Sequence, residues 1–288
     1  MPRQDTRGIV DAEALFTRVR FRRHDPVAPA LRPYVEHYWL IDWDLETPYA
    51  SNVVPHPSVN IVFQRYGDAS SAEVSGIGLE LFEQKLEGVG RVCGVQFRPG
   101  GFRPFAPGRP VSDWTGRRVP LTEAFPDAFP DTFPDTADAT TPHAILDPPT
   151  DEARVAALDA FLLTRGGPEG FRPDPAAERA MELVDLIRTG GDGPPVRRVD
   201  ELADRAGLSV RSLQRLFAAY VGVAPKWVVL RYRIHEALER AEADRAAEPD
   251  WAALAAELGY SDQAHLVRDF TATVGVPPTA YARALRAS

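Results

Sequence analysis

The segment LADRAGLSVRSLQRLF at residues 202–217 decides the fold of the C-terminal half, because a shifted second copy follows it. The second copy, LAAELGYSDQAHLVRDF, occupies residues 254–270. Each copy has Leu-Ala, a Gly four residues after that Ala, and then a Leu and a Phe four residues apart. Small residues let two helices approach, and a Gly turns the chain between them. The pattern therefore predicts two helix-turn-helix motifs.

The second helix of each motif begins after a polar residue that can cap it. Ser209 is the expected cap in the first copy. In the second copy one residue is inserted at the turn, so the cap is either Ser261 or Asp262. Leu213 and Phe217 are expected to face the core of the first motif, and Leu266 and Phe270 that of the second.

One long helical pattern, residues 225–246, joins the two copies. A helix of about 20 residues is roughly 30 Å long. Successive major-groove faces of B-DNA lie about 34 Å apart. The spacing thus predicts that one chain can place two recognition helices in adjacent major-groove segments.

The overall charge does not by itself indicate a nucleic-acid ligand. The chain has a formal net charge of -8, and the part from Asp174 onward holds 15 basic and 17 acidic residues. Domains that bind DNA mainly through phosphates usually carry a basic excess. Any positive surface must therefore be local.

The N-terminal part shows mainly β signals between Phe21 and Val119. Aromatic or β-branched runs at residues 34–43, 59–63, 73–77 and 91–97 are separated by Pro and Gly. Such short strands are typical of an antiparallel sheet, a sandwich or a cupin-like barrel. We therefore predict an α+β chain with a β-rich domain at 1–123, a connection with a linker helix at 124–173, and an all-α domain at 174–288.

The connection contains the repeat Ala-Phe-Pro-Asp, Ala-Phe-Pro-Asp, Thr-Phe-Pro-Asp at residues 124–135. Recurrent prolines exclude a continuous helix, so residues 124–150 are expected to be mainly extended. The three Phe either pack on a neighbour or belong to a partly disordered insertion. Two helices should follow, one over residues 151–164 and one that opens at Asp174-Pro175.

Residues 174–288 resemble the DNA-binding domain of the AraC/XylS family of bacterial transcription regulators. The resemblance rests on both turn motifs, the joining helix and the ending GYSDQAHLVRDF at residues 259–270, followed by VGVPP at residues 274–278. It covers the C-terminal domain. The segments PYVEHYW at 33–39, VPHP at 54–57 and GVQFRPGG at 94–101 look, more loosely, like the β-rich sensor-type domain that precedes it in many members.

The resemblance implies double-stranded operator or promoter DNA as a partner, and it locates the contacts on the two recognition helices. In the first helix, Arg and Gln are suited to purine edges. In the second, Ala264 and Val267 can meet only a thymine methyl group, so specificity should depend mainly on the first helix. The expected DNA-binding residues are Ser209, Arg211, Ser212, Gln214, Arg215, Gln263, Ala264, His265 and Arg268. Candidate phosphate contacts are Lys226, Arg231, Arg233, Arg197 and Arg198.

The N-terminal part shows no pattern of an enzyme. It has no His-x-His pair, HExxH, P-loop or Gly-x-Ser-x-Gly elbow, and Cys93 is the one cysteine of the chain. We therefore expect no catalytic residues, no metal and no cofactor, and a buried, apolar role for Cys93. The resemblance implies a domain that senses a small molecule or mediates dimerisation. An apolar or sugar-like effector would lie near Trp39, Trp43, His56 and Asn60.

Two functional hypotheses follow. The first is a sequence-specific DNA-binding transcription regulator, with RNA polymerase as a further partner if it activates and with a possible homodimer. The second is a protein-interaction adaptor whose double helix-turn-helix does not bind DNA. The sequence contains no apolar run of about 18 residues or more and no signal-peptide pattern, so we expect a cytoplasmic protein without a membrane partner.

Overall fold

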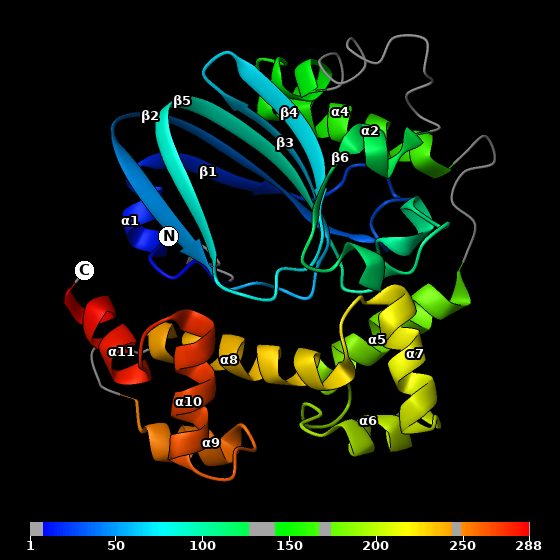
Figure 1. The fold of residues 1–288 in the computed structure, drawn as a ribbon, viewed down its shortest axis with the longest axis vertical. Coiled ribbons are helices and arrows are strands. Elements are labelled where there is room, and N and C mark those ends of the chain that lie inside the picture. The colour runs from blue at the N-terminus through cyan, green and yellow to red at the C-terminus, as the bar shows by residue number, and fades with distance from the viewer. Residues whose placement is uncertain (1–7, 127–141, 167–173, 244–248, 288) are drawn as a thin grey trace.

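Six antiparallel strands form one sheet in the N-terminal half, in the order β1-β2-β5-β3-β4-β6 (Figure 1). The computed structural model describes residues 8–126, 142–166, 174–243 and 249–287. The strands and short helices of this half are α1 (Ala12–Phe16), β1 (Val19–His24), β2 (Val35–Val53), β3 (Asn60–Tyr66), β4 (Ala69–Ser75), β5 (Phe82–Phe97), η1 (Arg103–Phe105), η2 (Val111–Trp114), β6 (Arg118–Pro120) and α2 (Leu121–Ala124). The antiparallel sheet is thus confirmed. The strands β1 and β6, which the sequence did not predict, form its two edges.

Strand β2 is much longer than predicted, because Pro48 does not end it. The register between β2 and β5 shifts between Leu45 and Tyr49, and the pairing of β2 with β1 stops at Trp43. Pro48 therefore lies at an irregularity in a part of the strand that β1 does not cover. Among the described residues, none on the β1 side pairs with Pro48, so the N–H that proline lacks is not required there.

The two faces of the sheet have different environments. On one face Tyr38, Leu40, Phe63 and Cys93 are 0% exposed and belong to the main apolar core. The predicted buried role of Cys93 is confirmed, and burial raises the pKa of its thiol to about 12. The opposite face, which includes Trp39, lines a cavity.

Helix α4 (Asp151–Leu163) covers the core face of the sheet. Its buried stripe of Val155, Leu158 and Leu162 joins the main core. Asp159 accepts hydrogen bonds from the Tyr38 hydroxyl at 2.5 Å and from the Ala28 amide at 2.6 Å. These bonds satisfy a carboxylate that is only 6% exposed, as buried polar groups require.

A group of charged side chains fixes the start of α4 at the edge of this core. Asp151 accepts hydrogen bonds from Arg22, and Arg22 also donates to Asp42 of β2. Burial alone would raise the pKa of Asp42, but hydrogen bonds from Arg91 and Arg22 hold it below its ordinary value. The carboxylate is therefore ionised at neutral pH, and it connects β1, β2 and β5.

The predicted connection differs from the structure at its end. Residues 142–146 are helical, and Ile145 and Leu146 are 2% and 0% exposed. Two apolar side chains in a row after the prolines can form a turn that packs on the core, so this part is not extended. Residues 127–141, which hold most of the Phe-Pro-Asp repeat, lie outside the described residues.

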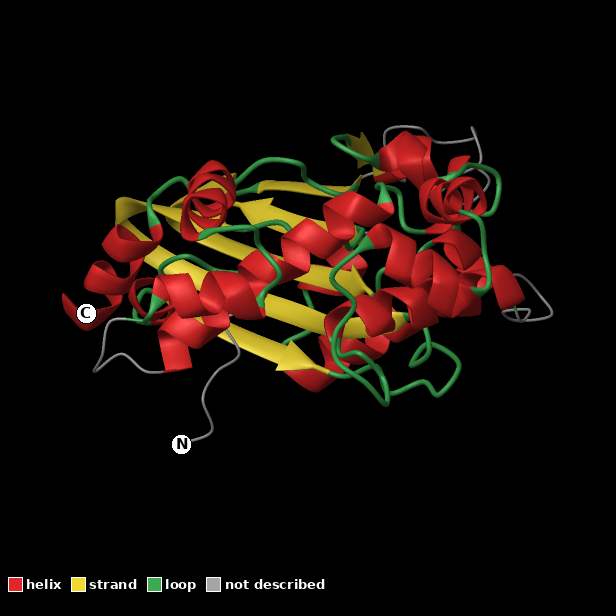
Figure 2. Ribbon diagram, turned by 90° about the horizontal axis from the view of Figure 1, so that it is seen from below, coloured by secondary structure: helices red, strands yellow, loops and turns green. Residues whose placement is uncertain are grey.

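The C-terminal half is helical, as predicted, and lies on one side of the sheet (Figures 1 and 2). Asp174 caps α5 by accepting from the amides of Ala176 and Ala177. The helices after α4 are η4 (Thr164–Gly166), α5 (Pro175–Arg188), α6 (Val199–Ala206), α7 (Val210–Tyr220), α8 (Pro225–Ala243), α9 (Trp251–Glu257), α10 (Gln263–Val274) and α11 (Pro278–Ala287). Among the described residues no helix is both long and apolar enough to cross a bilayer.

Two apolar cores hold these helices. The main core continues from the sheet through α5, α6 and α7 to Val228 and Val229 of α8. The second half of α8 packs with α9, α10 and α11 in a separate core that includes Trp251 and Phe270. The first helix-turn-helix therefore shares its core with the sheet, whereas the second has its own.

We predict that Asp159→Ala lowers the free energy of unfolding by about 2–4 kcal/mol, because it leaves the Tyr38 hydroxyl and the Ala28 amide buried without an acceptor. Chemical denaturation measures the change. The matched control is Glu152→Gln, an exposed acidic position on the same helix, which should cost less than about 0.5 kcal/mol. Equal effects of the two substitutions would contradict the role assigned to Asp159.

Candidate nucleic-acid interface and ligand cavity

The first motif consists of α6, a three-residue turn and α7. Gly207 ends α6 in the left-handed conformation, with φ 64°, where glycine is favoured. Ser209 caps α7, because its hydroxyl accepts from the Ser212 amide at 3.1 Å. This confirms the predicted turn and cap. Leu213 and Phe217 are 0% exposed.

The outer face of α7 is polar and open to solvent. Arg211, Gln214 and Arg215 are exposed, and Ser212 is half-buried. Within the described part of the chain, neither arginine forms an ion pair and Gln214 forms no side-chain hydrogen bond, so these groups are not engaged by the protein itself. Val210, in the first turn, is 42% exposed.

The second motif has a longer turn between α9 and α10, where the sequence shows an inserted residue. Asp262 is the cap, since its carboxylate accepts from the His265 amide at 2.7 Å. That hydrogen bond lowers the pKa of Asp262, so the cap is charged at neutral pH. Leu266 and Phe270 are 0% exposed, as predicted.

The outer face of α10 offers fewer polar groups than that of α7. Gln263, Ala264 and Arg268 are exposed. His265 is half-buried and lies 3.2 Å from the Ser261 hydroxyl and 3.6 Å from Asp269. Its ring is therefore engaged at the edge of the helix.

Helix α8 joins the two motifs and separates them in space. Figure 1 shows α6 and α7 at one end of α8 and α9 and α10 at the other. With 19 residues, the helix is about 28 Å long. This length is close to the repeat of the major groove, about 34 Å.

The candidate phosphate contacts have different environments. Lys226 is exposed at the start of α8. Arg231 and Arg233 are only 6% and 7% exposed, and burial lowers the pKa of Arg231 to about 10. In this conformation neither buried guanidinium can reach a phosphate, which corrects the prediction for both residues.

The buried arginines instead connect parts of the protein. Arg231 donates to the backbone oxygen of Leu79 at 3.3 Å and lies over the Trp227 ring. Arg233 donates to the backbone oxygen of Arg197 and lies over the Tyr260 ring. The sequence of α8 does not show that these arginines are buried, because the residues that cover them come from distant segments of the chain.

The other two candidate arginines have acidic partners. Arg197, with 18% of its side chain exposed, pairs with Glu236 at 2.6 Å. Arg198 is 74% exposed and pairs with Asp200 at 2.7 Å. Of the five candidates, Lys226 is thus the one that is neither buried nor paired with an acidic side chain among the described residues, so it is accessible to a phosphate.

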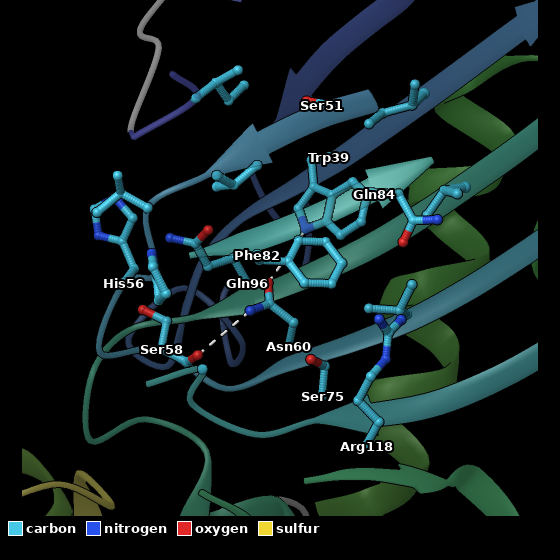
Figure 3. A pocket seen from close by; sticks show the side chains of 18 of the residues that line it. Trp39, Ser51, His56, Ser58, Asn60, Ser75, Phe82, Gln84, Gln96 and Arg118 are labelled. Atoms are coloured by element: carbon cyan, nitrogen blue, oxygen red, sulfur yellow. Dashed lines mark hydrogen bonds between the residues drawn. The ribbon is translucent and has the colours of Figure 1, made fainter. Parts of the chain in front are cut away.

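A cavity of about 610 Å³ lies on the second face of the sheet (Figure 3). Its volume is within the range of small-molecule sites, about 300–1,000 Å³. All four residues predicted for an effector pocket, Trp39, Trp43, His56 and Asn60, line it. Among the described residues no group of three His, Cys, Asp or Glu side chains is arranged to hold a metal ion.

Two glycines of β5 shape the floor of the cavity. The strand register places Trp39 opposite Gly94 and Trp43 opposite Gly90. A Cβ atom at either glycine would lie 2.0 Å from the facing indole ring. Each indole therefore lies flat on the backbone of β5, at a place where only glycine leaves room.

Several lining residues were missed in the sequence. They are Ser51, Ser58, Gln84, Gln96 and Arg118. The glycines under the two indoles, Gly90 and Gly94, were missed as well. A signal for the glycines existed, since Trp39 and Trp43 have the same four-residue spacing as Gly90 and Gly94. The shared spacing has a meaning only once it is known that β2 pairs with β5.

The wall of the cavity contacts α8. We define this cavity wall as residues 53–58 and 76–82, which contribute His56 and Leu79 to the lining. The His56 ring stacks on that of His235 with centroids 3.9 Å apart, and His235 Nε2 lies 3.2 Å from the backbone oxygen of Pro55. With the Arg231 bond to Leu79, two successive turns of α8 contact the cavity wall.

The N-terminal half also contacts the end of α7. Thr115 donates from its hydroxyl to the backbone oxygen of Gly222 at 2.7 Å, and Arg103 donates to that of Ala219 at 3.0 Å. Gly222 has a φ of 94°, and a Cβ atom there would lie 2.6 Å from Ile77. The sheet domain is therefore closely packed against the turn between α7 and α8.

Comparison with known proteins matches both halves of the chain to families. Residues 202–284 match a family described as a helix-turn-helix domain, and residues 22–120 match a domain of unknown function, DUF6597. No curated protein matches the chain.

Among solved structures, the chain is similar to ToxT from Vibrio cholerae. The P21 form of ToxT at 1.65 Å shows 11% identity and a TM-score of 0.39, with 92% of this chain and 98% of ToxT covered. Wild-type ToxT of strain SCE256 bound to an unsaturated fatty acid shows 14% identity and a TM-score of 0.41, with 85% and 94% covered. At these identities and TM-scores the similarity does not assign a function to the chain.

The fold and the two motifs define a two-domain protein in which an antiparallel β-sheet precedes a double helix-turn-helix. Residues 202–284 of its C-terminal part match the helix-turn-helix domain family. This agrees with the resemblance seen in the sequence.

We predict that Ser209→Ala and Asp262→Ala each lower the free energy of unfolding by about 1 kcal/mol, because each removes the acceptor that caps a recognition helix. Ser261→Ala serves as the control, since it leaves the Asp262 cap in place and should cost less than about 0.5 kcal/mol. Denaturant titration of the full chain gives the values. A larger loss for Ser261→Ala than for Asp262→Ala would show that the cap of α10 is misassigned.

Proposed function

We propose that the chain is a sequence-specific DNA-binding transcription regulator that inserts α7 and α10 into adjacent major-groove segments. The observation that carries the proposal is the pair of capped helices at the two ends of α8, each with a buried inner face and an exposed outer face. One chain presents both helices, so two groove segments can be read without a second copy.

The first recognition helix is proposed to provide most of the sequence readout. Arg211, Gln214 and Arg215 project from α7 and are suited to bidentate contacts with guanine or adenine. On α10 the comparable groups are Gln263 and Arg268, beside Ala264. Ser209, Ser212 and His265 lie at the ends or edges of these helices, where contacts to the sugar-phosphate backbone are more common than base contacts.

The phosphate contribution to affinity should be small for a protein of this class. The part from Asp174 onward has no basic excess, and the buried Arg231 and Arg233 are not included in the proposed interface. Lys226 and the amides at the first turn of α7, which an uncharged serine caps, remain as phosphate contacts, whereas the charged Asp262 at the start of α10 disfavours a phosphate there. We therefore expect a shallow salt dependence and a strong dependence on a few side chains.

The cavity is proposed to bind a small-molecule effector that modulates DNA binding. This proposal is supported by the contacts of the cavity wall with α8 and of Thr115 and Arg103 with the end of α7. A ligand that shifts the cavity wall would change the position of the helix that spaces the two motifs. Regulation then requires only a differential affinity of the ligand for two arrangements of α8.

We predict that Arg211→Ala and Arg215→Ala each weaken binding to the preferred DNA by about 1–3 kcal/mol and relax the base preference at one position. Lys226→Ala should weaken binding to all sequences alike and reduce the salt slope by about one unit. The experiment is selection from fragmented genomic DNA with the full chain, followed by affinity measurement for each variant. Lys85→Ala, at an exposed lysine of β5, is the charge-matched control and should leave the affinity unchanged.

Failure of the wild-type chain to select any DNA would overturn the proposal and favour the protein-interaction adaptor. Selection of DNA with unchanged affinity in both arginine variants would instead show that α7 is not the main reading helix. The two results are distinguishable because the first concerns the whole domain and the second only one of its helices.

We predict that the selected DNA changes the hydrogen exchange of amides in the cavity wall, because coupling between two sites is reciprocal. His235→Phe keeps an aromatic ring beside His56 but removes the nitrogen near Pro55, and should reduce this change in residues 53–58. Glu239→Gln, at an exposed position one turn further along α8, is the control. If DNA does not change the hydrogen exchange of amides in the cavity wall, the proposed coupling is contradicted.

A further inference from the structure

The cavity face of the sheet is arranged in rows by the strand register, and one row is entirely polar. His37 of β2 pairs with Gln96 of β5, Gln96 with Asn60 of β3, and Asn60 with Ser75 of β4. All four residues line the cavity. Since neighbouring strands lie about 4.8 Å apart, these four residues form a continuous line, which we call the polar row.

The next row along the strands offers a stacking surface. The Trp39 indole packs on the backbone of β5 at Gly94, and Trp39 also lines the cavity. Trp39 is half-buried, whereas Trp43 is 4% exposed and has the Tyr66 ring 5.1 Å away. Trp39 is therefore the indole that is available to a ligand.

On the side of Trp39 away from the polar row, the positions on β1, β2 and β5 are apolar. Phe21 pairs with Ile41, and Ile41 with Val92, and all three line the cavity. The row ends on β3 with Gln64, which also lines the cavity and whose carboxamide donates to the Ser71 hydroxyl at 3.1 Å. A ring placed on Trp39 would thus have hydrogen-bonding groups along one edge and hydrocarbon along the opposite edge. This one-sided polarity does not suit a sugar, which carries hydroxyl groups around the whole ring.

The carboxamides of the polar row are not saturated by the protein. Gln96 makes no side-chain hydrogen bond with any other described residue. The bonds of Asn60 are long, at 3.4 Å from Trp39 Nε1 and 3.5 Å to the backbone oxygen of Ser58. Each carboxamide has both a donor and an acceptor to offer. Figure 3 shows the two side chains on neighbouring strands close to Trp39.

Three arginines line the cavity, and each contacts other groups of the protein. Arg117 lies 3.8 Å from Glu123. Arg118 pairs with Glu73, and its guanidinium lies 5.3 Å from the centre of the Phe82 ring. The guanidinium of Arg23 lies over the Phe21 ring at 4.9 Å. The polar row itself contains no lysine or arginine. An anionic ligand would therefore meet uncharged amides at the edge beside Trp39.

We infer that the cavity binds an uncharged planar heterocycle with an amide edge, a cyclic amide or imide, stacked on Trp39 and hydrogen-bonded to Gln96 and Asn60. This inference rests on the proposal that the cavity is the effector site. The paired N–H and C=O of such an edge match the donor and acceptor of a carboxamide. The hydrocarbon edge of the ring lies over Ile41 and Val92.

The test is calorimetric titration of the full chain with matched probes. Phthalimide and isoquinolin-1-one carry the amide edge opposite a hydrocarbon edge, indene has the ring shape of phthalimide without the amide, naphthoate is a flat anion, and glucose is a polyhydroxylated ring. We expect at least one cyclic amide to bind at least about tenfold more tightly than indene, naphthoate and glucose.

Variants locate the contact. Gln96→Leu should weaken cyclic-amide binding about tenfold or more but leave indene binding unchanged, which also shows that the cavity is still folded. Trp39→Ala should weaken the binding of both the cyclic amides and indene. Arg23→Gln should affect neither.

Absence of binding by both cyclic amides overturns the inference, as does preferential binding of glucose. Preferential binding of naphthoate that is lost in Arg23→Gln also overturns it and identifies an anion site. Measuring the affinity for the selected DNA with each probe separates the two proposals. If a cyclic amide binds without changing the affinity for DNA, the ligand class is upheld and the proposed regulation is contradicted. If only glucose or naphthoate changes the affinity for DNA, the proposed regulation is upheld and the ligand class is contradicted.

Discussion

The packing of α8 into two cores is the constraint on which the rest of the structure depends. Its first half belongs to the core that contains the sheet, and its second half to the core of the second motif. Arg231 and His235, at the transition, are buried and contact backbone oxygens of the cavity wall. A helix fixed in this way sets the distance between α7 and α10. It also brings the helix that joins the two motifs into contact with the cavity wall, although the two are far apart in the sequence.

The parts of the structure that the sequence predicts are those that depend on local periodicity. The caps at Ser209 and Asp174, the left-handed Gly207 and the buried Leu213 and Phe217 follow from residues within a few positions of one another. A helical repeat satisfies most of its backbone hydrogen bonds locally, so its pattern is visible without knowledge of the fold. The outward direction of Arg211 follows for the same reason.

The cavity and the interface between the halves were less predictable because they depend on pairing between distant segments. The four aromatic and polar residues expected at the pocket do line it, but nothing local to Gly94 indicates that an indole lies on it. The same holds for Arg231 and Arg233. Their charge suggests an exposed phosphate contact, and only the approach of Leu79 and Tyr260 shows that they are internal. Residue type alone therefore does not distinguish a DNA contact from a structural arginine on α8.

The two motifs, which look like repeats in the sequence, are inequivalent in the structure. The first is fused to the sheet domain through a common core, and Gly222 leaves no room for even a methyl group beside Ile77. The second motif touches the N-terminal half mainly through Val54 and partly buried side chains such as Val10 and Leu81. The cavity wall therefore contacts both motifs, through Ile77 at the end of α7 and through Val54 and Leu81 at the second motif. Since α7 also exposes more polar side chains than α10, the proposed function assigns the two motifs different roles. In that proposal the motif attached to the sheet provides the main readout, and the position of the other determines whether both groove segments are occupied at once.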